Sequence, residues 1–259
     1  MSGPLSGQGV VVTGAGHGIG GALATRMAAG GARVVVNDLD AGSATQVAAS
    51  IGGYAAPGDA ASEQGVAALV AAACEHLGEI DIWFGNAGID RGHGLDASEA
   101  DWAAALDVNV LAHVRAARLL VPGWVERGSG RFVVTASAAG LLTMLGSPAY
   151  AVTKHGAVAF AEWLSATYRH RGVVVQAICP QGVRTRMLED AGPLQELLSH
   201  DVTLEPEDIA EAMWQALQDD RILVLPHPEV AEYYRLRAAD PDRWLAGMNK
   251  LQRRLEDHG

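Results

Sequence analysis

Two side chains four residues apart carry the clearest chemical signal in this sequence. Tyr150 and Lys154 lie in the segment 149–169, whose pattern predicts a helix, so both side chains are expected on one face of it. An ammonium group beside a phenol favours the phenolate and lowers the phenol pKa toward the range of an acid/base catalyst. The same pair also occurs on ordinary helix surfaces. Here lysine is scarce, because only Lys154 and Lys250 are lysine among the 19 basic side chains.

A glycine-rich segment near the N-terminus, residues 13–20, indicates a second kind of chemistry. It follows the apolar run 10–12 and precedes a helical pattern, and such a strand, turn and helix can hold a nucleotide pyrophosphate. Small residues let the backbone approach the phosphates, and unpaired N–H groups at the helix start face negative charge. Glycine also collects in turns and helix caps, so the motif alone is a weak indication. Its place in a repeating strand–helix chain favours nucleotide binding.

Alternating strand and helix patterns must position these groups. Nearly continuous apolar strands are typical of a parallel sheet covered on both faces. The sequence therefore predicts one α/β domain over residues 1–259, with a single doubly wound, Rossmann-type parallel sheet and helices on both faces. Strands are predicted at 9–13, 33–38, 54–57, 80–85, 131–137, 173–179 and 222–225, and helices at 21–29, 41–51, 62–77, 99–126, 149–169 and 206–218.

Two segments fall outside this alternation. Residues 184–203 follow a strand end and are placed to form a substrate loop over the carboxyl ends of the strands. The C-terminal extension, residues 226–259, carries Trp244, Met248 and Leu251 at helical spacing. This spacing predicts a helix packed on its own domain or on a neighbour, with a lid over the site as the alternative.

Composition limits the classes of function. With 259 residues, 49% of them hydrophobic, the chain can bury a substantial core. A net charge of −11 argues against general affinity for nucleic acid or an anionic membrane. No signal peptide is expected, and no apolar run reaches the roughly 18 residues of a membrane span. We expect a soluble, cytoplasmic protein without a metal site, in which Cys74 and Cys179 are small buried hydrophobes.

The motifs, in their order and spacing, resemble those of the short-chain dehydrogenase/reductase family in its single-domain form. The resemblance runs from about residue 5 to residue 225. Residues 13–20 match the TGxxxGxG cofactor loop, and residues 85–88 match NNAG with Gly85 in place of the first Asn. Residues 180–185 resemble PGxVxT, with Gln181 in place of its glycine. The family's helix asparagine, catalytic serine and YxxxK pair are matched by Asn109, Ser137, Tyr150 and Lys154.

The resemblance implies hydride transfer between a nicotinamide cofactor and an alcohol or ketone. Tyr150 would exchange a proton with the substrate oxygen, and Ser137 would hydrogen-bond that oxygen. Lys154 would hold the ribose hydroxyls and lower the pKa of Tyr150. Asn109 would anchor a water through which the proton reaches solvent. As alternatives, Ser137 is a turn residue at a strand end and Asn109 a helix residue bonded to nearby backbone.

Asp38 indicates which dinucleotide is used. It ends the second predicted strand, about 20 residues past the glycine loop, where a carboxylate can accept hydrogen bonds from the adenosine ribose and repel a 2′-phosphate. His17 in the loop is mostly neutral at pH 7. NAD is therefore predicted over NADP. Asp59 would contact the adenine, or be a plain loop residue before a helix. The expected cofactor contacts are Gly14, His17, Gly18, Ile19, Gly20, Asp38, Leu39, Asp59, Ala60, Asn86, Ala87, Gly88, Tyr150, Lys154, Pro180, Val183 and Thr185.

The expected substrate pocket is mostly apolar. A neutral, hydrophobic secondary alcohol or its ketone fits such a lining, although apolar residues at these positions could equally be core. Gln181 could lie beside the nicotinamide carboxamide or point into the substrate site, and both interpretations stay open. The residues expected to contact substrate are Ser137, Ala139, Leu145, Tyr150, Gln181 and Met187.

Two other functions share part of this set of motifs. A redox sensor or scaffold that binds the dinucleotide without turnover would be favoured by loss of Tyr150, Lys154 or Ser137, and all three are present. An epimerase or dehydratase of the related extended family is disfavoured by the glycine spacing and the lack of a second domain. The family usually assembles through its long helices, here 99–126 and 149–169, so a homotetramer, or a homodimer, is expected.

Overall fold

Parallel strands form the frame of the molecule. The computed structural model describes residues 3–189 and 202–258, and in it seven parallel strands make one sheet in the order β3-β2-β1-β4-β5-β6-β7. The chain changes direction across the sheet between β1 and β4, as in a doubly wound fold. The predicted sheet is confirmed. The strands are β1 (Gly9–Val12), β2 (Arg33–Val36), β3 (Tyr54–Ala55), β4 (Ile82–Gly85), β5 (Gly130–Thr135), β6 (Val173–Ile178) and β7 (Leu223–Val224).

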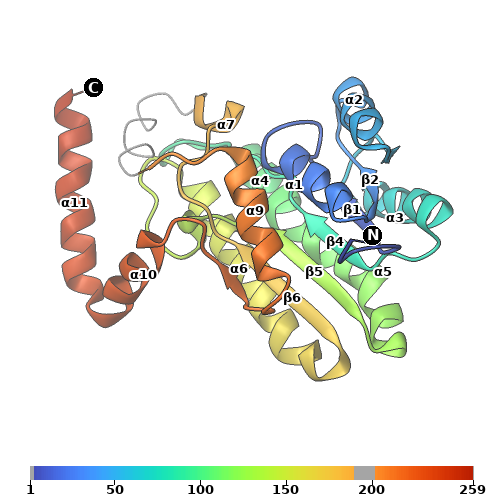
Figure 1. Ribbon diagram of the computed structural model, residues 1–259. Coiled ribbons are helices and arrows are strands. Elements are labelled where there is room, and N and C mark those ends of the chain that lie inside the picture. The colour runs from blue at the N-terminus through green and yellow to red at the C-terminus, as the bar shows by residue number, and fades with distance from the viewer. Residues whose placement is uncertain (1–2, 190–201, 259) are drawn as a thin grey trace.

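Helices cover both faces of the sheet (Figure 1). On one face, α1 (Gly18–Ala29), α2 (Ala41–Ile51) and α9 (Pro206–Ala216) pack against Val10 and Val12 of β1. On the other face, α3 (Glu63–Leu77), α5 (Ala112–Arg127) and α6 (Pro148–Tyr168) pack against Val11 of the same strand. Successive strand residues point to opposite faces, so an all-apolar strand serves both layers at once.

The helix predicted over 99–126 is interrupted. It consists of α4 (Glu99–Leu106), a π-helical turn (Asp107–Leu111) and α5. Asn109 is fully buried in that turn, where its amide binds backbone and side-chain groups outside the helix. Single π turns of this kind occur often at functional sites. The predicted start of the first helix was also wrong, because α1 begins at Gly18 rather than residue 21.

The two cysteines differ in exposure. Cys179 is fully buried at the end of β6, as expected, whereas Cys74 is exposed on α3. The buried side of α3 carries Val66, Leu69 and Ala73, and Cys74 lies one residue past it. The expectation of a buried Cys74 was therefore wrong. Within the described residues, no cluster of three or more His, Cys, Asp or Glu side chains could hold a metal ion.

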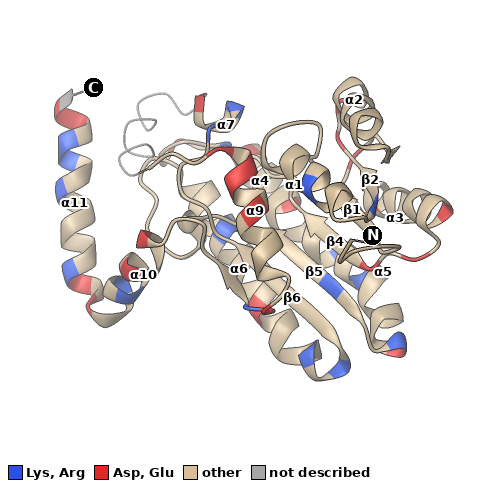
Figure 2. Cartoon of the chain, in the orientation of Figure 1, with Lys and Arg blue, Asp and Glu red and all other residues tan. Residues whose placement is uncertain are grey.

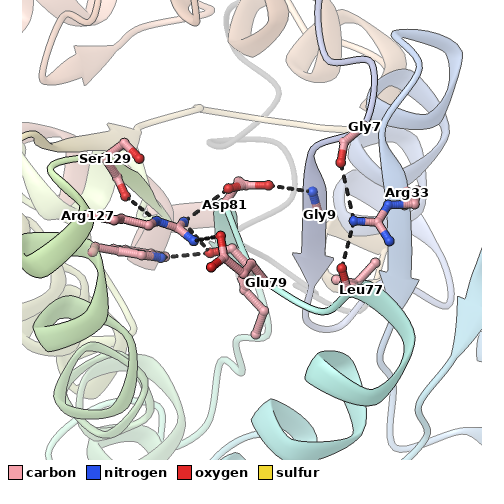
Figure 3. Close-up of polar contacts among 10 residues, drawn as sticks. Gly7, Gly9, Arg33, Leu77, Glu79, Asp81, Arg127 and Ser129 are labelled. Atoms are coloured by element: carbon pink, nitrogen blue, oxygen red, sulfur yellow. Dashed lines mark hydrogen bonds and ion pairs between the residues drawn. The ribbon is translucent and has the colours of Figure 1, made fainter.

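A polar cluster holds the amino ends of the central strands, at the far end from the site described below (Figure 3). The Arg127 guanidinium, from the end of α5, donates to Glu79 at 2.7 Å, to Asp81 at 3.1 Å and to the Ser129 carbonyl at 2.7 Å. Asp81 in turn accepts the backbone N–H of Gly9 at 2.8 Å. One arginine thus connects the starts of β1 and β4 to the end of α5.

The C-terminal extension forms two helices rather than one. These are α10 (Glu229–Ala239) and α11 (Pro241–His258), at the opposite side of the molecule from α2 and α3 (Figure 1). The Trp244 indole N–H donates to the Thr143 hydroxyl at 3.0 Å, and the Trp244 ring lies 6.3 Å from that of Tyr233. The start of α11 is therefore fastened to its own domain.

Charged side chains lie mainly on the helices and in the loops, and the strands carry few of them (Figure 2). α11 carries basic and acidic residues along its length (Figure 2). None of the described helices combines the length and apolarity needed to cross a bilayer.

Candidate active site

A cleft of about 950 Å³ opens at the carboxyl ends of the strands. Ligands bind at this edge of open α/β sheets, because the loops that follow the strands and the helix N-termini converge there. The cleft is lined by every residue that the sequence assigned to cofactor or substrate contacts; of the four expected catalytic residues, only Asn109 lies outside its lining.

The glycine loop is held tightly against the end of β4. Gly14 has a positive φ of 59°, and a Cβ there would lie 2.8 Å from the Ala87 Cα. A Cβ on Gly20 would lie 2.2 Å from the Gly14 carbonyl oxygen. The Asn86 side chain donates to the carbonyls of Thr13 and Gly14, at 3.0 and 3.1 Å. Only glycine fits at these two positions. The N-terminus of α1 lies at the cleft, where its free N–H groups suit an anionic phosphate.

Two carboxylates lie at the adenosine end expected for a dinucleotide. Asp38 accepts the backbone N–H of Gly16 at 2.9 Å, so it faces the glycine loop. Asp59 accepts the N–H groups of Ala61 and Ser62, at 2.7 and 3.1 Å. The Ser62 hydroxyl and these backbone bonds hold the pKa of Asp59 below its usual value. Asp59 therefore both lines the cleft and bonds to the chain leading into α3.

Tyr150, Lys154 and Ser137 meet in the cleft. Lys154, on α6, is 3% exposed, and its Nζ lies 5.5 Å from the centre of the Tyr150 ring. The ammonium donates to the carbonyl of Thr135, at the end of β5, at 2.9 Å. Ser137 follows that strand. Its hydroxyl accepts the N–H of Ala139 at 3.1 Å, and its presence beside Tyr150 lowers the pKa of that phenol. The i, i+4 spacing on α6 and the end of β5 together produce this convergence.

Burial dominates the electrostatics of this group. It raises the pKa of Tyr150 to about 12, against a smaller lowering by the Ser137 hydrogen bond. It also lowers the pKa of Lys154 to about 8. The expectation that Lys154 lowers the Tyr150 pKa therefore does not hold for the protein alone, because loss of hydration disfavours both charged forms.

Asn109 lies behind the cleft and connects three segments. Its side-chain oxygen accepts the N–H of Ile89, and its amide donates to the Ile89 carbonyl, both at 2.9 Å. The amide also donates to the Thr153 hydroxyl on α6 at 3.0 Å. A Cβ on Gly88 would lie 3.2 Å from Lys154 Nζ and 3.3 Å from Asn109 Oδ1. The Asn109 side chain thus bonds to backbone, as expected if it is a structural helix residue. The same bonds fix the loop that faces Lys154.

His113 is a residue that the sequence reasoning missed. It lies on α5, is buried, and contacts the edge of Phe132 with 6.4 Å between ring centres. Burial, and then the charge of Lys154, lower its pKa to about 3, so the ring is neutral. A Cβ on Gly85 would lie 2.5 Å from its Nδ1. His113 therefore fills the space beside the glycine that replaces the family's first asparagine, and an isolated histidine gave no sequence signal for this.

His227, which lies between Pro226 and Pro228, was missed as well. Its Nδ1 accepts the backbone N–H of Gln181 at 3.1 Å, so the proton of the neutral ring is on Nε2. That nitrogen lies 3.2 Å from the Gly182 carbonyl and 3.1 Å from the Val202 carbonyl. The ring thereby holds the segment after β6, and with it Gln181, at the edge of the cleft.

The substrate end of the cleft has an apolar outer wall. Tyr233 from α10 and Trp244, Met248 and Leu251 from α11 line it, together with Leu142. The predicted substrate loop is described only to residue 189, where α7 (Arg186–Glu189) places Met187 in the cleft lining. Arg184 pairs with Glu205 at 2.6 Å. The remainder of that loop, residues 190–201, lies outside the described residues.

Residues 8–195 match the family model for short chain dehydrogenase. A 1-deoxy-11-beta-hydroxypentalenate dehydrogenase from Streptomyces exfoliatus is 34% identical over 249 residues, covering 93% of this chain and 90% of that protein. A 2,5-dichloro-2,5-cyclohexadiene-1,4-diol dehydrogenase from Sphingobium indicum is 36% identical over 208 residues, covering 78% of this chain and 80% of that protein.

Solved structures share the fold. A short chain dehydrogenase/reductase from Burkholderia phymatum, in complex with NAD, matches with a TM-score of 0.84 and 28% identity, over 92% of this chain and 95% of that one. A 7 alpha-hydroxysteroid dehydrogenase, complexed with NADH and 7-oxo glycochenodeoxycholic acid, matches with a TM-score of 0.78 and 28% identity, over 85% and 93%.

Proposed function

Because the chain belongs to the short-chain dehydrogenase/reductase family, we propose that it interconverts a hydrophobic secondary alcohol and its ketone with NAD. The observation that carries this proposal is the meeting of Tyr150, Lys154 and Ser137 in the cleft that also holds the glycine loop. A dinucleotide fits the loop because a Cβ at Gly14 or Gly20 would collide with neighbouring backbone. When bound, it would supply the hydride acceptor for oxidation and the donor for reduction.

In the proposed reaction, the residues of this chain manage the proton. During oxidation the hydrogen on the carbinol carbon would leave as hydride, with the electron pair of its C–H bond. The hydroxyl proton would pass to the Tyr150 phenolate. During reduction Tyr150 returns that proton to the carbonyl oxygen. Ser137, which lines the cleft together with Tyr150, would orient the substrate oxygen against the phenol. Lys154, whose Nζ lies 5.5 Å from the centre of the Tyr150 ring, would hold the ribose hydroxyls.

The high pKa of Tyr150 suits the neutral phenol, which is the form needed as a proton donor. Oxidation needs the phenolate instead, and the positive charge of an oxidised nicotinamide beside the ring would favour it. Lys154, with a pKa of about 8, can lose its proton near the working pH and would pass it to solvent. We assign Asn109 the role of fixing that exit path through its contact with Thr153.

Asp38 supports NAD as the preferred dinucleotide. Its carboxylate lies against the glycine loop, 2.9 Å from the Gly16 nitrogen, where it would accept hydrogen bonds from ribose hydroxyls. A 2′-phosphate placed there would meet a carboxylate rather than a cation. The next residues, Leu39 and Asp40, bring no positive charge either.

The apolar wall of the cleft supports a bulky, hydrophobic substrate. Trp244, Met248 and Leu251 offer surface to the ring system or chain that carries the reacting carbon. The names of the relatives from Streptomyces exfoliatus and Sphingobium indicum, and of the hydroxysteroid dehydrogenase, indicate cyclic alcohols. We propose a ring alcohol as the first class to test.

We also propose assembly into a homotetramer, with a homodimer as the alternative. Large apolar side chains remain exposed on the helices through which the family assembles: Leu119 on α5 is 48% exposed, and Val152 and Trp163 on α6 are 53% and 56% exposed. Patches of this kind mark interfaces in soluble proteins, and a self-complementary one gives closed symmetric assemblies.

Purified protein, NAD⁺ and a panel of cyclic and aryl secondary alcohols test the proposal, with NADH formation followed by its absorbance. The expected result is turnover of at least one alcohol, with NADP⁺ a poor substitute. Tight NADH binding without turnover of any alcohol or ketone would overturn the enzymatic proposal in favour of a dinucleotide-binding sensor or scaffold.

A further inference from the structure

An acidic side chain lies among the groups of the cleft and has no place in the proton transfer described above. Asp90 follows the glycine turn after β4 and lines the cleft together with Ser137 and Tyr150. Its two oxygens differ. Oδ2 accepts a hydrogen bond from the Ser147 hydroxyl at 3.3 Å, whereas Oδ1 is buried and has no hydrogen-bond partner among the described residues.

The orientation of this carboxylate is fixed from behind. Ser147 is fully buried just before α6, and its hydroxyl oxygen lies 2.8 Å from His93 Nδ1. An ionised carboxylate only accepts hydrogen bonds, so Ser147 must donate to Asp90 and accept from the N–H of His93. His93 thus donates to Ser147, and Ser147 donates to Asp90. These hydrogen bonds hold the Asp90 carboxylate in place without neutralising its negative charge.

The charge of Asp90 is unpaired within the described part of the chain, where no arginine or lysine lies within ion-pair distance. The Asp90 charge raises the pKa of Tyr150, in the same direction as burial, and raises that of Lys154, against the larger lowering caused by burial. Asp90 also lines the same cleft as these two groups. Leaving a buried acceptor without a donor is unfavourable, so this arrangement calls for a donor from the cleft.

We propose that Asp90 accepts a hydrogen bond from a second hydroxyl group of the substrate, so that the preferred substrates are hydrophobic diols and hydroxyketones rather than simple alcohols. This inference rests on the proposed oxidoreductase function and names its substrate class. A hydroxyl meets the requirement better than an ammonium group, because Lys154 already places positive charge in the same cleft and Leu142 and Met144 add apolar surface to its lining. A site built to bind a hydroxyl discriminates strongly against the analogue that lacks it.

The test compares a cyclic diol with the matched mono-alcohol, indane-1,2-diol and indan-1-ol, in the intact protein with NAD⁺. We expect kcat/KM to favour the diol by roughly ten- to a hundredfold in the wild type, which is the range for a buried hydrogen bond to a charged group. Asp90→Ala should remove that preference by lowering the rate with the diol, and Asp90→Asn should retain part of it. Asp96→Ala removes an exposed carboxylate from the same loop and is the control.

Equal kcat/KM for the two alcohols in the wild type, or an equal loss of both in Asp90→Ala, would overturn the inference while turnover of the mono-alcohol still supported the proposed function. Absence of turnover with both would instead count against the function itself. Calorimetric titration of the diol into the Tyr150→Phe protein saturated with NAD⁺, with and without Asp90→Ala, supplies a readout that needs no catalysis. There, diol binding that Asp90→Ala leaves unchanged would overturn the inference.

Discussion

His113 Nδ1 lies 2.5 Å from the position that a Cβ on Gly85 would take. The absence of a side chain on the glycine at the end of β4 thus makes room for the buried histidine of α5. The imidazole fills the volume beside the central strand that a side chain at position 85 would need. Its edge contact with Phe132 then connects β4, β5 and α5 immediately behind the cleft.

This pairing predicts a strong coupling between positions 85 and 113. Gly85→Asn in the wild-type background should lower the free energy of unfolding by about 1–3 kcal/mol, because the new side chain overlaps the imidazole. His113→Ala alone should also destabilise the protein by leaving a cavity. The double variant should be more stable than the sum of the two effects indicates. Urea denaturation of all four proteins measures the coupling, and simple additivity would contradict it.

Tyr150→Phe should abolish turnover and leave NADH affinity nearly unchanged. The variant loses only the hydroxyl that exchanges the proton, and general acid–base catalysis of this kind contributes about 10²–10⁴-fold. Initial rates and fluorescence titration with NADH measure the two properties. Tyr54→Phe, at an exposed position on β3, is the matched control. A Tyr150→Phe protein that kept a large share of the wild-type rate would assign the proton transfer to another group.

Asp38→Ala should shift the dinucleotide preference toward NADP. Removal of the carboxylate near Gly16 removes both an acceptor for the ribose hydroxyls and the repulsion of a 2′-phosphate. The ratio of kcat/KM for NAD⁺ to that for NADP⁺ should fall by roughly tenfold or more, the equivalent of about 1.4 kcal/mol. A wild-type protein that already prefers NADP⁺ would contradict the proposed role of Asp38.

Lys154 should make stability depend on pH in a predictable direction. Burial lowers its pKa from 10.5 to about 8, so between these values the unfolded chain binds more protons than the folded one. Stability from this group therefore rises with pH through that window. Relative to Lys154→Met, the wild type should gain up to a few kcal/mol in the free energy of unfolding between pH 7 and pH 10. Urea denaturation across this range measures the difference in the free energy of unfolding between the two proteins. A difference that stays constant with pH would show that folding does not lower the pKa of Lys154.

Trp163→Glu should dissociate the assembly proposed above. The tryptophan is 56% exposed on α6, and a carboxylate at that position would be desolvated and paired with its own copy in a symmetric interface. Light scattering after size-exclusion chromatography should show a smaller mass for the variant and a tetramer or dimer for the wild type. Arg171→Glu, an exposed change just past the end of α6, is the control. A monomeric wild type would contradict the proposal.

The sheet and most of the cleft could be predicted from sequence because their signals are local. A continuous apolar strand such as β1 needs only a parallel sheet to explain it, and the glycine loop needs a close backbone approach. Both requirements appear directly in residue type and spacing. The sheet order then brings the loop and the end of β5 to one edge.

Features that depend on tertiary contacts could not be predicted in the same way. The π turn around Asn109 arises because its amide bonds to Ile89 and Thr153, which are 20 and 44 residues away. The exposure of Cys74 follows from the rotation of α3 about its axis, which a pattern rich in alanine leaves ambiguous. The pKa of Tyr150 was misjudged because spacing reveals a charged neighbour but not the loss of hydration that outweighs it.

The hydrogen bond between Trp244 and Thr143 joins two parts of the chain that have different proposed roles. Every group proposed to act on the hydride or proton precedes residue 196, within the span of the family model, whereas the apolar wall comes from the last thirty or so positions of the chain. Exchange of those two terminal helices for others of similar length should retune which molecules are accepted and leave the reaction intact. The part of selectivity that these helices set would then be transferable to other chains of the family, whereas the part proposed for Asp90 would stay with the domain that carries out the reaction.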